Sequence, residues 1–390
     1  MQPMTTDKAA RAGRSVRQPG GFEAFIPEPL PPADLRIDAS LGALFSRSDR
    51  ELGRLEGATA LVPDPDFFVF MYVRREAVLS SQIEGTQASL MDVLEFEAMR
   101  DASDARVDVR EITNHIAAMH LGLDRLAGLP ISRRLLCEVH AELMRGVRGG
   151  EPQKTPGEFR RSQNWIGGAS PMTARFVPPP WAEVGPAFSQ LERYLHDEAP
   201  VAPLVKIGLV HAQFETIHPF LDGNGRMGRL LITFWLMQQG ILRRPLLYPS
   251  LYFKEHRVEY IDRLQAIRDR GDWEGWLAFF VEGIGVAARE AADRALDIVR
   301  LREEDRARIA ASSGRRSPNA HALLDRLYEF PLVSAKRVQE LVDVSQPTAG
   351  ALLKDLTRVG ILREVTGRRR DRLFAYDRYL ALFPNAEDRG

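Results

Sequence analysis

The chain has 390 residues, of which 53 are Lys or Arg and 53 are Asp or Glu, so its formal net charge at neutral pH is zero. A chain of this length usually folds into two or three domains. The balanced charge excludes a protein that binds nucleic acid or a membrane surface along its whole length, although a local basic patch remains compatible with it. Hydrophobic residues make up 44% and charged residues 27%, which excludes a wholly disordered chain.

The single cysteine, Cys137, excludes an intramolecular disulfide and is typical of a protein of a reducing compartment. The longest strongly apolar stretch, residues 230–237, is too short to span a bilayer. The basic N-terminal residues are not followed by an apolar run, so the sequence predicts no secretory signal. We therefore expect a cytoplasmic protein without a membrane partner.

The chain is expected to be mostly α, because apolar residues recur at intervals of three and four from about residue 35 to about residue 300. Residues 1–34 are rich in Gly, Pro, Arg and Ser, which predicts an extended, flexible arm. The predicted organisation is, in chain order, this arm (1–34), an N-terminal helical region (35–110), a helical core (111–285), a connecting helix and linker (286–316) and a C-terminal domain (317–385).

Residues 67–84 predict a helix with its apolar side chains on one face, ending at Gly85, since glycine suits the left-handed conformation just beyond a helix. Glu84 then lies in the last turn, where its carboxylate faces the negative end of the helix dipole. Two interpretations are open: an exposed glutamate tolerated at small cost, or a glutamate paired with a buried cation elsewhere in the fold.

One segment interrupts the helical pattern. Residues 159–166 and 174–177 flank Gly167 and Gly168 and predict a β-hairpin with a long loop at about 158–178. An exposed strand edge can pair with an extended segment of another protein through main-chain hydrogen bonds. A plain surface hairpin is the alternative.

Residues 218–229 read His-Pro-Phe-Leu-Asp-Gly-Asn-Gly-Arg-Met-Gly-Arg and carry the strongest chemical signal. Pro219 disfavours helical conformation at the residue before it, so the preceding helix is expected to end at His218. A second helix follows the glycine-rich turn, and the free N–H groups at its start form an anion site. Arg226 and Arg229 lie near this positive helix end, which is unfavourable unless a multiply charged anion binds between them.

Each of these residues has a simpler interpretation when it is taken alone. His218 could be a structural hydrogen-bonding residue, and Asp222 could be the N-cap of the second helix. Together, the cluster supplies a base, a metal-binding carboxylate, a phosphate cradle and two phosphate clamps within one short segment.

The C-terminal segment predicts a winged helix-turn-helix. A charged helix at about 287–311 and a Ser/Gly/Arg linker precede it; its second and third helices are expected at 334–342 and 345–359, and its strands at 361–365 and 373–376. The expected recognition helix and basic wing carry Ser345, Gln346, Thr348 and Lys354, and Arg368, Arg369, Arg370 and Arg372. DNA binding is one interpretation, and a protein–protein or dimerisation module is the other, because basic residues exceed acidic ones here only modestly.

The segment His218-Pro-Phe-Leu-Asp-Gly-Asn-Gly-Arg-Met-Gly-Arg229 matches in full the signature His-x-Phe-x-Asp/Glu-Gly-Asn-Gly-Arg-x-x-Arg, and the chain therefore resembles the Fic (filamentation induced by cAMP) proteins. The resemblance implies a helical Fic-type core in which the 158–178 hairpin is a flap beside the active site. It also implies transfer of AMP from ATP, with Mg²⁺ as cofactor, to a hydroxyl side chain of a target protein or of the protein itself.

Carried over residue by residue, the resemblance makes His218 the general base and Phe220 the core anchor of the loop. Asp222 is similar to the family's Mg²⁺ ligand. The resemblance further implies an ATP-binding set that holds the phosphates: Gly223, Asn224, Gly225, Arg226 and Arg229.

The segment Ser80-Ser-Gln-Ile-Glu-Gly85 is similar to the inhibitory motif of the same family, Ser/Thr-x-x-x-Glu-Gly/Asn. The resemblance implies that Glu84 binds Arg229, occupies the position of the γ-phosphate and misaligns ATP. The wild-type protein is then expected to be restrained.

Other functions remain open at this stage. Relatives that act as kinases depart from the Gly-Asn-Gly-Arg pattern, which is intact here, so AMP is favoured over another phosphate-containing group. Hydrolysis of AMP from a modified target is a further alternative. A protein of another class, a DNA-binding regulator with a nucleotide-sensing core, also fits the sequence, and whether the protein forms a homodimer stays open.

Overall fold

The computed structural model describes residues 8–60, 66–99, 107–198, 201–312, 317–368 and 370–384. The predicted arm, linker and C-terminal domain therefore extend beyond the described residues at 1–7, 313–316 and 385, and Arg369 of the predicted wing lies outside them as well. The helices are α1 (Ala39–Ala60), α2 (Asp66–Ile83), α3 (Leu90–Met99), α4 (Val107–Leu126), α5 (Arg133–Leu143), α6 (Trp181–His196), α7 (Pro203–Ile217), α8 (Asn224–Gln238), α9 (Ser250–Glu255), α10 (Arg257–Arg270), α11 (Trp273–Ser312), α12 (Ser317–Leu327), α13 (Ala335–Val342), α14 (Gln346–Arg358) and α15 (Asp377–Leu380), with 3₁₀ turns at Lys8–Arg11 and Pro152–Lys154.

The prediction of a mostly α fold is confirmed. The strands are few and short: β1 (Gly13–Arg17), β2 (Glu23–Pro27), β3 (Leu332–Ser334), β4 (Arg363–Glu364) and β5 (Leu373–Ala375). No helix in the described ranges combines the length and the apolar composition that a membrane span requires.

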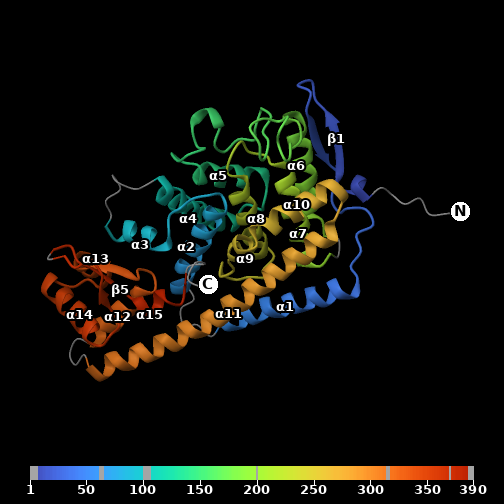
Figure 1. Ribbon diagram of the computed structural model, residues 1–390. Coiled ribbons are helices and arrows are strands. Elements are labelled where there is room, and N and C mark those ends of the chain that lie inside the picture. The colour runs from blue at the N-terminus through green and yellow to red at the C-terminus, as the bar shows by residue number, and fades with distance from the viewer. Residues whose placement is uncertain are drawn as a thin grey trace.

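Helix α11, with 40 residues, is the longest element and lies beside α1 along one edge of the molecule (Figure 1). The two backbones approach closely where Ser48 Oγ donates to the carbonyl of Val281 at 2.9 Å. Gly285 permits this approach, because a Cβ at that position would lie 2.4 Å from Ser48 Oγ. The expected boundary between core and connecting helix at 285/286 falls within α11, which continues without interruption from Trp273 to Ser312.

Helix α7 lies at the centre of the core and positions the chemical segment. All its side chains from Leu204 to Ile217 are buried, as expected for a helix surrounded by other helices. Helices α6, α8 and α11 pack around it, and the Trp276 indole donates to the carbonyl of Gly208 at 2.8 Å. The residue that follows α7 is consequently held by a rigid scaffold.

The N-terminal segment, expected to be a flexible arm, instead contains an antiparallel hairpin of β1 and β2. The Phe25 N–H donates to the carbonyl of Val177 at 2.9 Å, and the Phe25 ring packs 6.0 Å from the ring of Phe176. This partner lies about 150 residues away in the sequence. The Gly- and Pro-rich composition gives no sign of these strands, because a contact with a distant segment of the chain stabilises them.

The expected β-hairpin at 158–178, which we call the flap, is present as a loop closed by one antiparallel bridge between Ile166 and Phe176. The expected longer strands are not formed because side chains occupy the backbone acceptors. Gln163 Nε2 donates to the carbonyl of Pro178 at 2.9 Å, and Arg160 Nη2 donates to that of Pro179 at 2.6 Å. Side-chain hydrogen bonds thus replace part of the ladder.

The C-terminal region contains α12, β3, α13, α14, β4 and β5, with a three-stranded sheet in the order β3–β5–β4. Helices α13 and α14 agree with the predicted second and third helices to within one residue at each end. Ser334 caps α13 by accepting a hydrogen bond from the Arg337 N–H at 3.2 Å. The sequence analysis missed β3, which has only three residues.

The last described residues return to the N-terminal part of the fold and pack on α2. The guanidinium of Arg75, which is 3% exposed, donates to the carbonyls of Phe383 at 2.8 Å and Pro384 at 2.6 Å. The Phe383 ring meets the edge of Tyr72, also on α2, at 5.6 Å. Helix α2 is therefore held directly by the end of the C-terminal domain.

We expect Arg75→Met to destabilise the protein by about 1–3 kcal/mol, because it leaves one buried and one partly buried carbonyl without their charged donor. Urea denaturation should show this as a lower midpoint. The matched control is Arg134→Met, which removes a 73% exposed side chain from a surface ion pair and should change stability by no more than about 0.5 kcal/mol. Equal midpoints for the two variants would contradict the assigned role of Arg75.

Candidate active site

The segment 218–229 forms a tight loop between α7 and α8. As predicted, the helix ends at His218, which caps α7 in the left-handed conformation with φ of 50°. Gly223 also has a positive φ, of 75°, and precedes the first residue of α8. Because the first turn of a helix leaves its N–H groups without intrahelical acceptors, this turn presents donors and a positive dipole end to one site.

His218 has the properties of a neutral base. Its Nδ1 is buried without a hydrogen-bond partner among the described residues. Burial lowers the pKa of His218 to about 3, and the charges of Arg268 and Arg160 act in the same direction. The imidazole is therefore uncharged at physiological pH and can accept a proton.

Phe220 anchors the loop, as expected. It is fully buried, and its ring stacks on His140 with 3.8 Å between the ring centroids. The side chain of Asn224 donates to the Phe220 carbonyl and accepts from the Phe220 N–H, both at 2.8 Å. The amide of Asn224 is thus used within the loop, which leaves its backbone N–H, in the first turn of α8, as the group able to contact an anion.

Asp222 is the residue of the loop that could hold a metal ion. Its side chain is 40% exposed; Oδ1 accepts from the Gly223 N–H at 2.7 Å, and Oδ2 lies 3.4 Å from Lys154 Nζ. Within the described ranges no three His, Cys, Asp or Glu side chains gather as a metal site. Mg²⁺ is commonly bound by one or two carboxylates together with phosphate oxygens, so this single hard carboxylate beside an anion site fits it.

Arg226 is a buried cation with unused hydrogen-bonding capacity. The residue is 5% exposed, and its Nε and Nη1 have no hydrogen-bond partner in the part of the chain that the structure describes. Its nearest carboxylate oxygen, Asp222 Oδ1, is 3.9 Å away. A buried, incompletely paired guanidinium costs free energy unless an anion completes it, so Arg226 could donate hydrogen bonds to an anion.

Arg229 is, by contrast, fully occupied by the segment that the sequence analysis singled out. Its Nη2 donates to Glu84 Oε1 at 2.7 Å and to the Ser80 carbonyl at 2.9 Å, and its Nε donates to Ser80 Oγ at 2.8 Å. Burial alone lowers the pKa of Arg229, but the charge and hydrogen bond of Glu84, together with Tyr260 and Glu215, outweigh it, and the pKa lies above its ordinary value. Of the two interpretations of Glu84, the structure has the one in which it pairs with a buried cation.

The end of α2 explains how Glu84 reaches this position. The Thr86 N–H donates to the Ser81 carbonyl and the Gly85 N–H to the Gln82 carbonyl, which together define a Schellman motif with Gly85 at the left-handed position, φ 102°. Across the site, Gly225 makes room for the carboxylate, because a Cβ there would lie 2.2 Å from Glu84 Oε1. Glu84 therefore occupies the anion site at the start of α8.

A second layer of polar residues supports Arg229, and the sequence analysis did not identify it. His211 must donate from Nδ1 to the Gly228 carbonyl at 2.9 Å, so its Nε2 accepts from the Tyr260 hydroxyl at 2.8 Å. Glu215, one turn further along α7, is buried, and burial raises its pKa to about 7. The available signal was the spacing of His211 and Glu215, four positions apart and hence on one face of a helix that also carries many apolar residues.

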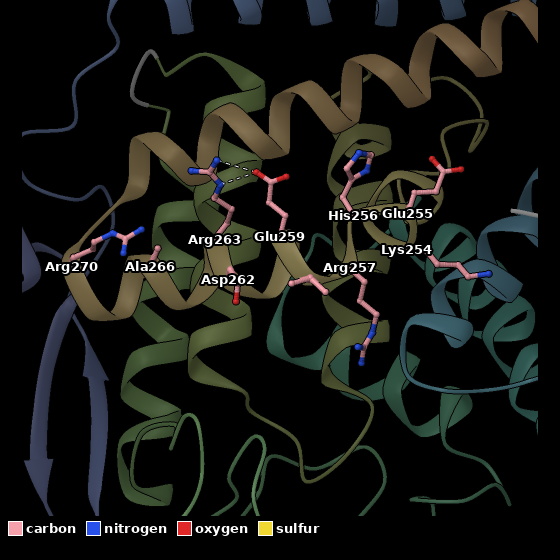
Figure 2. A pocket seen from close by; sticks show the side chains of 10 residues that line it. Lys254, Glu255, His256, Arg257, Glu259, Asp262, Arg263, Ala266 and Arg270 are labelled. Carbon is pink, nitrogen blue, oxygen red and sulfur yellow. Dashed lines mark hydrogen bonds and ion pairs between the residues drawn. The ribbon is translucent and has the colours of Figure 1, made fainter. Parts of the chain in front are cut away.

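A cavity of about 840 Å³ lies along α9 and α10 and is lined by residues between Lys254 and Arg270 (Figure 2). The end of α2 borders it: Arg257 Nε donates to the Ile83 carbonyl at 3.0 Å, and Lys254 Nζ donates to Gln82 Oε1 at 2.7 Å. On another side the flap reaches α10 through an ion pair of Arg175 with Asp262 at 2.5 Å. The cavity thus lies between the flap and the glutamate-bearing end of α2.

The fold and the site together define a helical protein with a histidine next to the start of a helix, where a carboxylate from a neighbouring helix pairs with a buried arginine. Family models match two successive parts of the chain: Fic/DOC family N-terminal at residues 43–124 and Fic/DOC family at residues 130–236. The chain belongs to the Fic/DOC family.

Relatives and solved structures agree with this assignment. The chain is 32% identical over 155 residues to the protein adenylyltransferase Fic of Culex quinquefasciatus and 30% identical over 205 residues to that of Drosophila ananassae. These matches cover 39% and 51% of this chain, but only 27% and 38% of those relatives.

Two solved structures share the fold. A Fic family protein from Desulfovibrio desulfuricans superposes with a TM-score of 0.57 and 19% identity, over 88% of this chain and 97% of the other. A Fic domain containing signaling protein from Bacteroides thetaiotaomicron gives a TM-score of 0.51 and 16% identity, over 64% and 95%.

Proposed function

We propose that the protein transfers AMP from ATP to a hydroxyl side chain of a target protein or of itself. The observation that carries the proposal is the neutral imidazole of His218 beside the start of α8, where Nε and Nη1 of the buried Arg226 have no hydrogen-bond partner among the described residues. The relatives named protein adenylyltransferase Fic support the same chemistry.

In the proposed reaction His218 accepts the proton of a Ser, Thr or Tyr hydroxyl while the hydroxyl oxygen attacks the α-phosphorus of ATP. The bond from that phosphorus to the oxygen bridging to the β-phosphate breaks, and pyrophosphate leaves with the electron pair. The backbone N–H groups of Gly225 and Arg226 and the Arg226 guanidinium bind and orient the phosphates. Asp222 would hold Mg²⁺, which neutralises phosphate charge when it is bound.

The cavity over α9 and α10 is the proposed place of the adenosine. It adjoins the anion site through the end of α2, where Arg257 contacts Ile83 next to Glu84. A volume of about 840 Å³ lies within the range of small-molecule sites. A nucleotide lying there has its phosphates at α8 and its base beside α10.

The flap is the proposed docking edge for the target. The strand β2 already covers the outgoing limb, through the bond from Phe25 to Val177. An extended target segment is therefore expected to pair with the incoming limb, at about 162–168, where Trp165 is 41% exposed.

Glu84 is the proposed inhibitor. Its bond to Arg229 occupies a guanidinium that would otherwise bind the end of the triphosphate. The carboxylate lies where Gly225 has made space, so it also places negative charge beside the phosphate site. ATP can then bind productively only after Glu84 leaves.

The decisive test is intact mass spectrometry of wild type, Glu84→Gly and His218→Ala after incubation with ATP and Mg²⁺. A gain of one AMP unit in Glu84→Gly, small in wild type and absent in His218→Ala, is the expected result. A gain of phosphate would instead indicate a kinase. Loss of AMP from a modified target incubated with wild type would indicate the reverse, hydrolytic reaction.

The pH dependence of transfer gives a separate prediction. Since the pKa of His218 is lowered to about 3, the base remains unprotonated as the pH falls from 8 to 5. We expect kcat/KM of the Glu84→Gly variant, which reports groups of the free enzyme, to show no decline centred near pH 6.5. A decline there would mean that a histidine of ordinary pKa is the base.

We further propose that the C-terminal region is a winged-helix domain able to bind DNA. Ser345, at the N-cap of α14, and Gln346 and Lys354 of this helix are exposed, and the β4–β5 loop exposes Arg368, Arg370 and Arg372. Both features suit a helix in the major groove and a wing on the backbone. A DNA-binding assay with Lys354→Ala tests this role. We expect Lys354→Ala to weaken DNA binding and leave AMP transfer unchanged, and His218→Ala to abolish AMP transfer and leave DNA binding unchanged.

A further inference from the structure

His140 is a buried residue of α5 whose two ring nitrogens are both engaged. The Gly157 N–H donates to Nδ1 at 2.8 Å, so the ring proton must be on Nε2, which donates to the carbonyl of Asp222 at 3.0 Å. The tautomer is thus fixed by its two partners.

The bond to Asp222 has consequences for the carboxylate of the same residue. The peptide group that joins Asp222 to Gly223 carries the carbonyl held by His140 on one side and the Gly223 N–H on the other. That N–H donates to Asp222 Oδ1 at 2.7 Å. By fixing the peptide plane, His140 therefore fixes the direction of the carboxylate and leaves Oδ2 turned away from the loop, toward Lys154 at 3.4 Å.

His140 also joins the loop to the base of the flap. The Gly157 that donates to its Nδ1 stands at the start of the flap segment, and the ring stacks on Phe220 with an angle of 6° between the planes. One imidazole thus connects the flap, the loop core and the carboxylate that could hold the metal.

We propose that His140 is a positioning residue for the transfer reaction, which acts by orienting the Asp222 carboxylate through the Asp222–Gly223 peptide. This inference rests on the proposed function. Loss of an interaction that orients a metal ligand typically costs about 10- to 100-fold in metal affinity or activity.

The test uses three substitutions in the Glu84→Gly protein. His140→Phe keeps the stacking on Phe220 and removes both hydrogen bonds; His140→Asn keeps an acceptor near Nδ1; His140→Gln keeps a donor near Nε2. We expect His140→Phe and His140→Asn to lower kcat by about 10- to 100-fold and to raise the Mg²⁺ concentration for half-maximal activity, and His140→Gln to restore both. The matched control is His196→Phe on α6, which removes an imidazole bond to the Ile131 carbonyl before α5 and should change neither.

The outcomes separate this inference from the proposed function. Unchanged kcat and Mg²⁺ dependence in His140→Phe would overturn it, and so would an equal loss in His140→Phe and His140→Gln with no change in Mg²⁺ dependence. If the Glu84→Gly parent shows no transfer, the proposed function fails, and calorimetry of ATP binding with and without Mg²⁺ still tests His140. In that experiment Mg²⁺ should raise the affinity for ATP in His140→Gln but not in His140→Phe. If Mg²⁺ raises the affinity of His140→Phe for ATP as well, the inference about His140 is wrong.

Discussion

Glu84→Gly should raise AMP transfer by about 10- to 100-fold over wild type. The bond from Arg229 to Glu84 joins two charged groups, and such bonds contribute about 1.5–3 kcal/mol, with each 1.4 kcal/mol corresponding to a factor of about ten. Removing the carboxylate makes the Arg229 guanidinium available to the phosphates of ATP. It also removes a negative charge next to Gly225. The rate of AMP incorporation, measured by mass spectrometry under initial-rate conditions, gives the size of the effect.

The same substitution should make the protein less stable without nucleotide and more responsive to it. Arg229 is 1% exposed, so removing its partner leaves a buried charge incompletely paired. Binding of ATP supplies a new anion and stabilises the folded state by mass action. We therefore expect a lower melting temperature for Glu84→Gly alone and a larger rise with ATP than in wild type.

A matched pair of variants separates loss of inhibition from general loosening of α2. Glu84→Gln and Glu97→Gln each neutralise the partner of a buried arginine; Glu97 binds Arg74 of the same helix at 2.8 Å, away from the loop. Only Glu84→Gln should increase transfer. A similar increase in Glu97→Gln would indicate that movement of α2, and not removal of the Glu84 carboxylate, activates the protein.

Those parts of the site that follow local rules were predictable from the sequence. Pro219 determines where α7 ends, and Gly85 determines how α2 ends, because both depend on the conformational preference of one or two residues. The anion site follows in the same way from a glycine turn before a helix. The identity of the partner of Glu84 came from the family resemblance, since no local pattern specifies a contact 145 residues away.

The parts that depend on distant contacts could not be predicted. The strands of the N-terminal hairpin are ordered by the flap, and the role of His140 depends on both Gly157 and Asp222. The sequence pattern places Asn224 in the phosphate-binding set, and the structure adds a contact that the pattern does not specify: its amide closes the loop on Phe220. The same residue type suits both roles, and only the three-dimensional arrangement distinguishes them.

His218→Ala should reduce transfer by about 10²- to 10⁴-fold, the usual contribution of a general base, while ATP binding is retained. His218 lies at the C-terminal end of α7, whereas the buried cations Arg226 and Arg229 belong to α8. Loss of the imidazole should therefore remove the proton acceptor without removing a phosphate contact. Calorimetry in the Glu84→Gly background should give similar ATP affinities with and without His218.

The backbone at this position requires a second variant. His218 has φ of 50°, a conformation that alanine adopts at a cost of about 1–3 kcal/mol and that asparagine tolerates better. His218→Asn thus keeps the loop while removing the base, and we expect it to be as inactive as His218→Ala but closer to wild type in stability. If His218→Asn retained most of the transfer activity, the loss in His218→Ala would reflect a displaced loop, and another group would have to accept the proton.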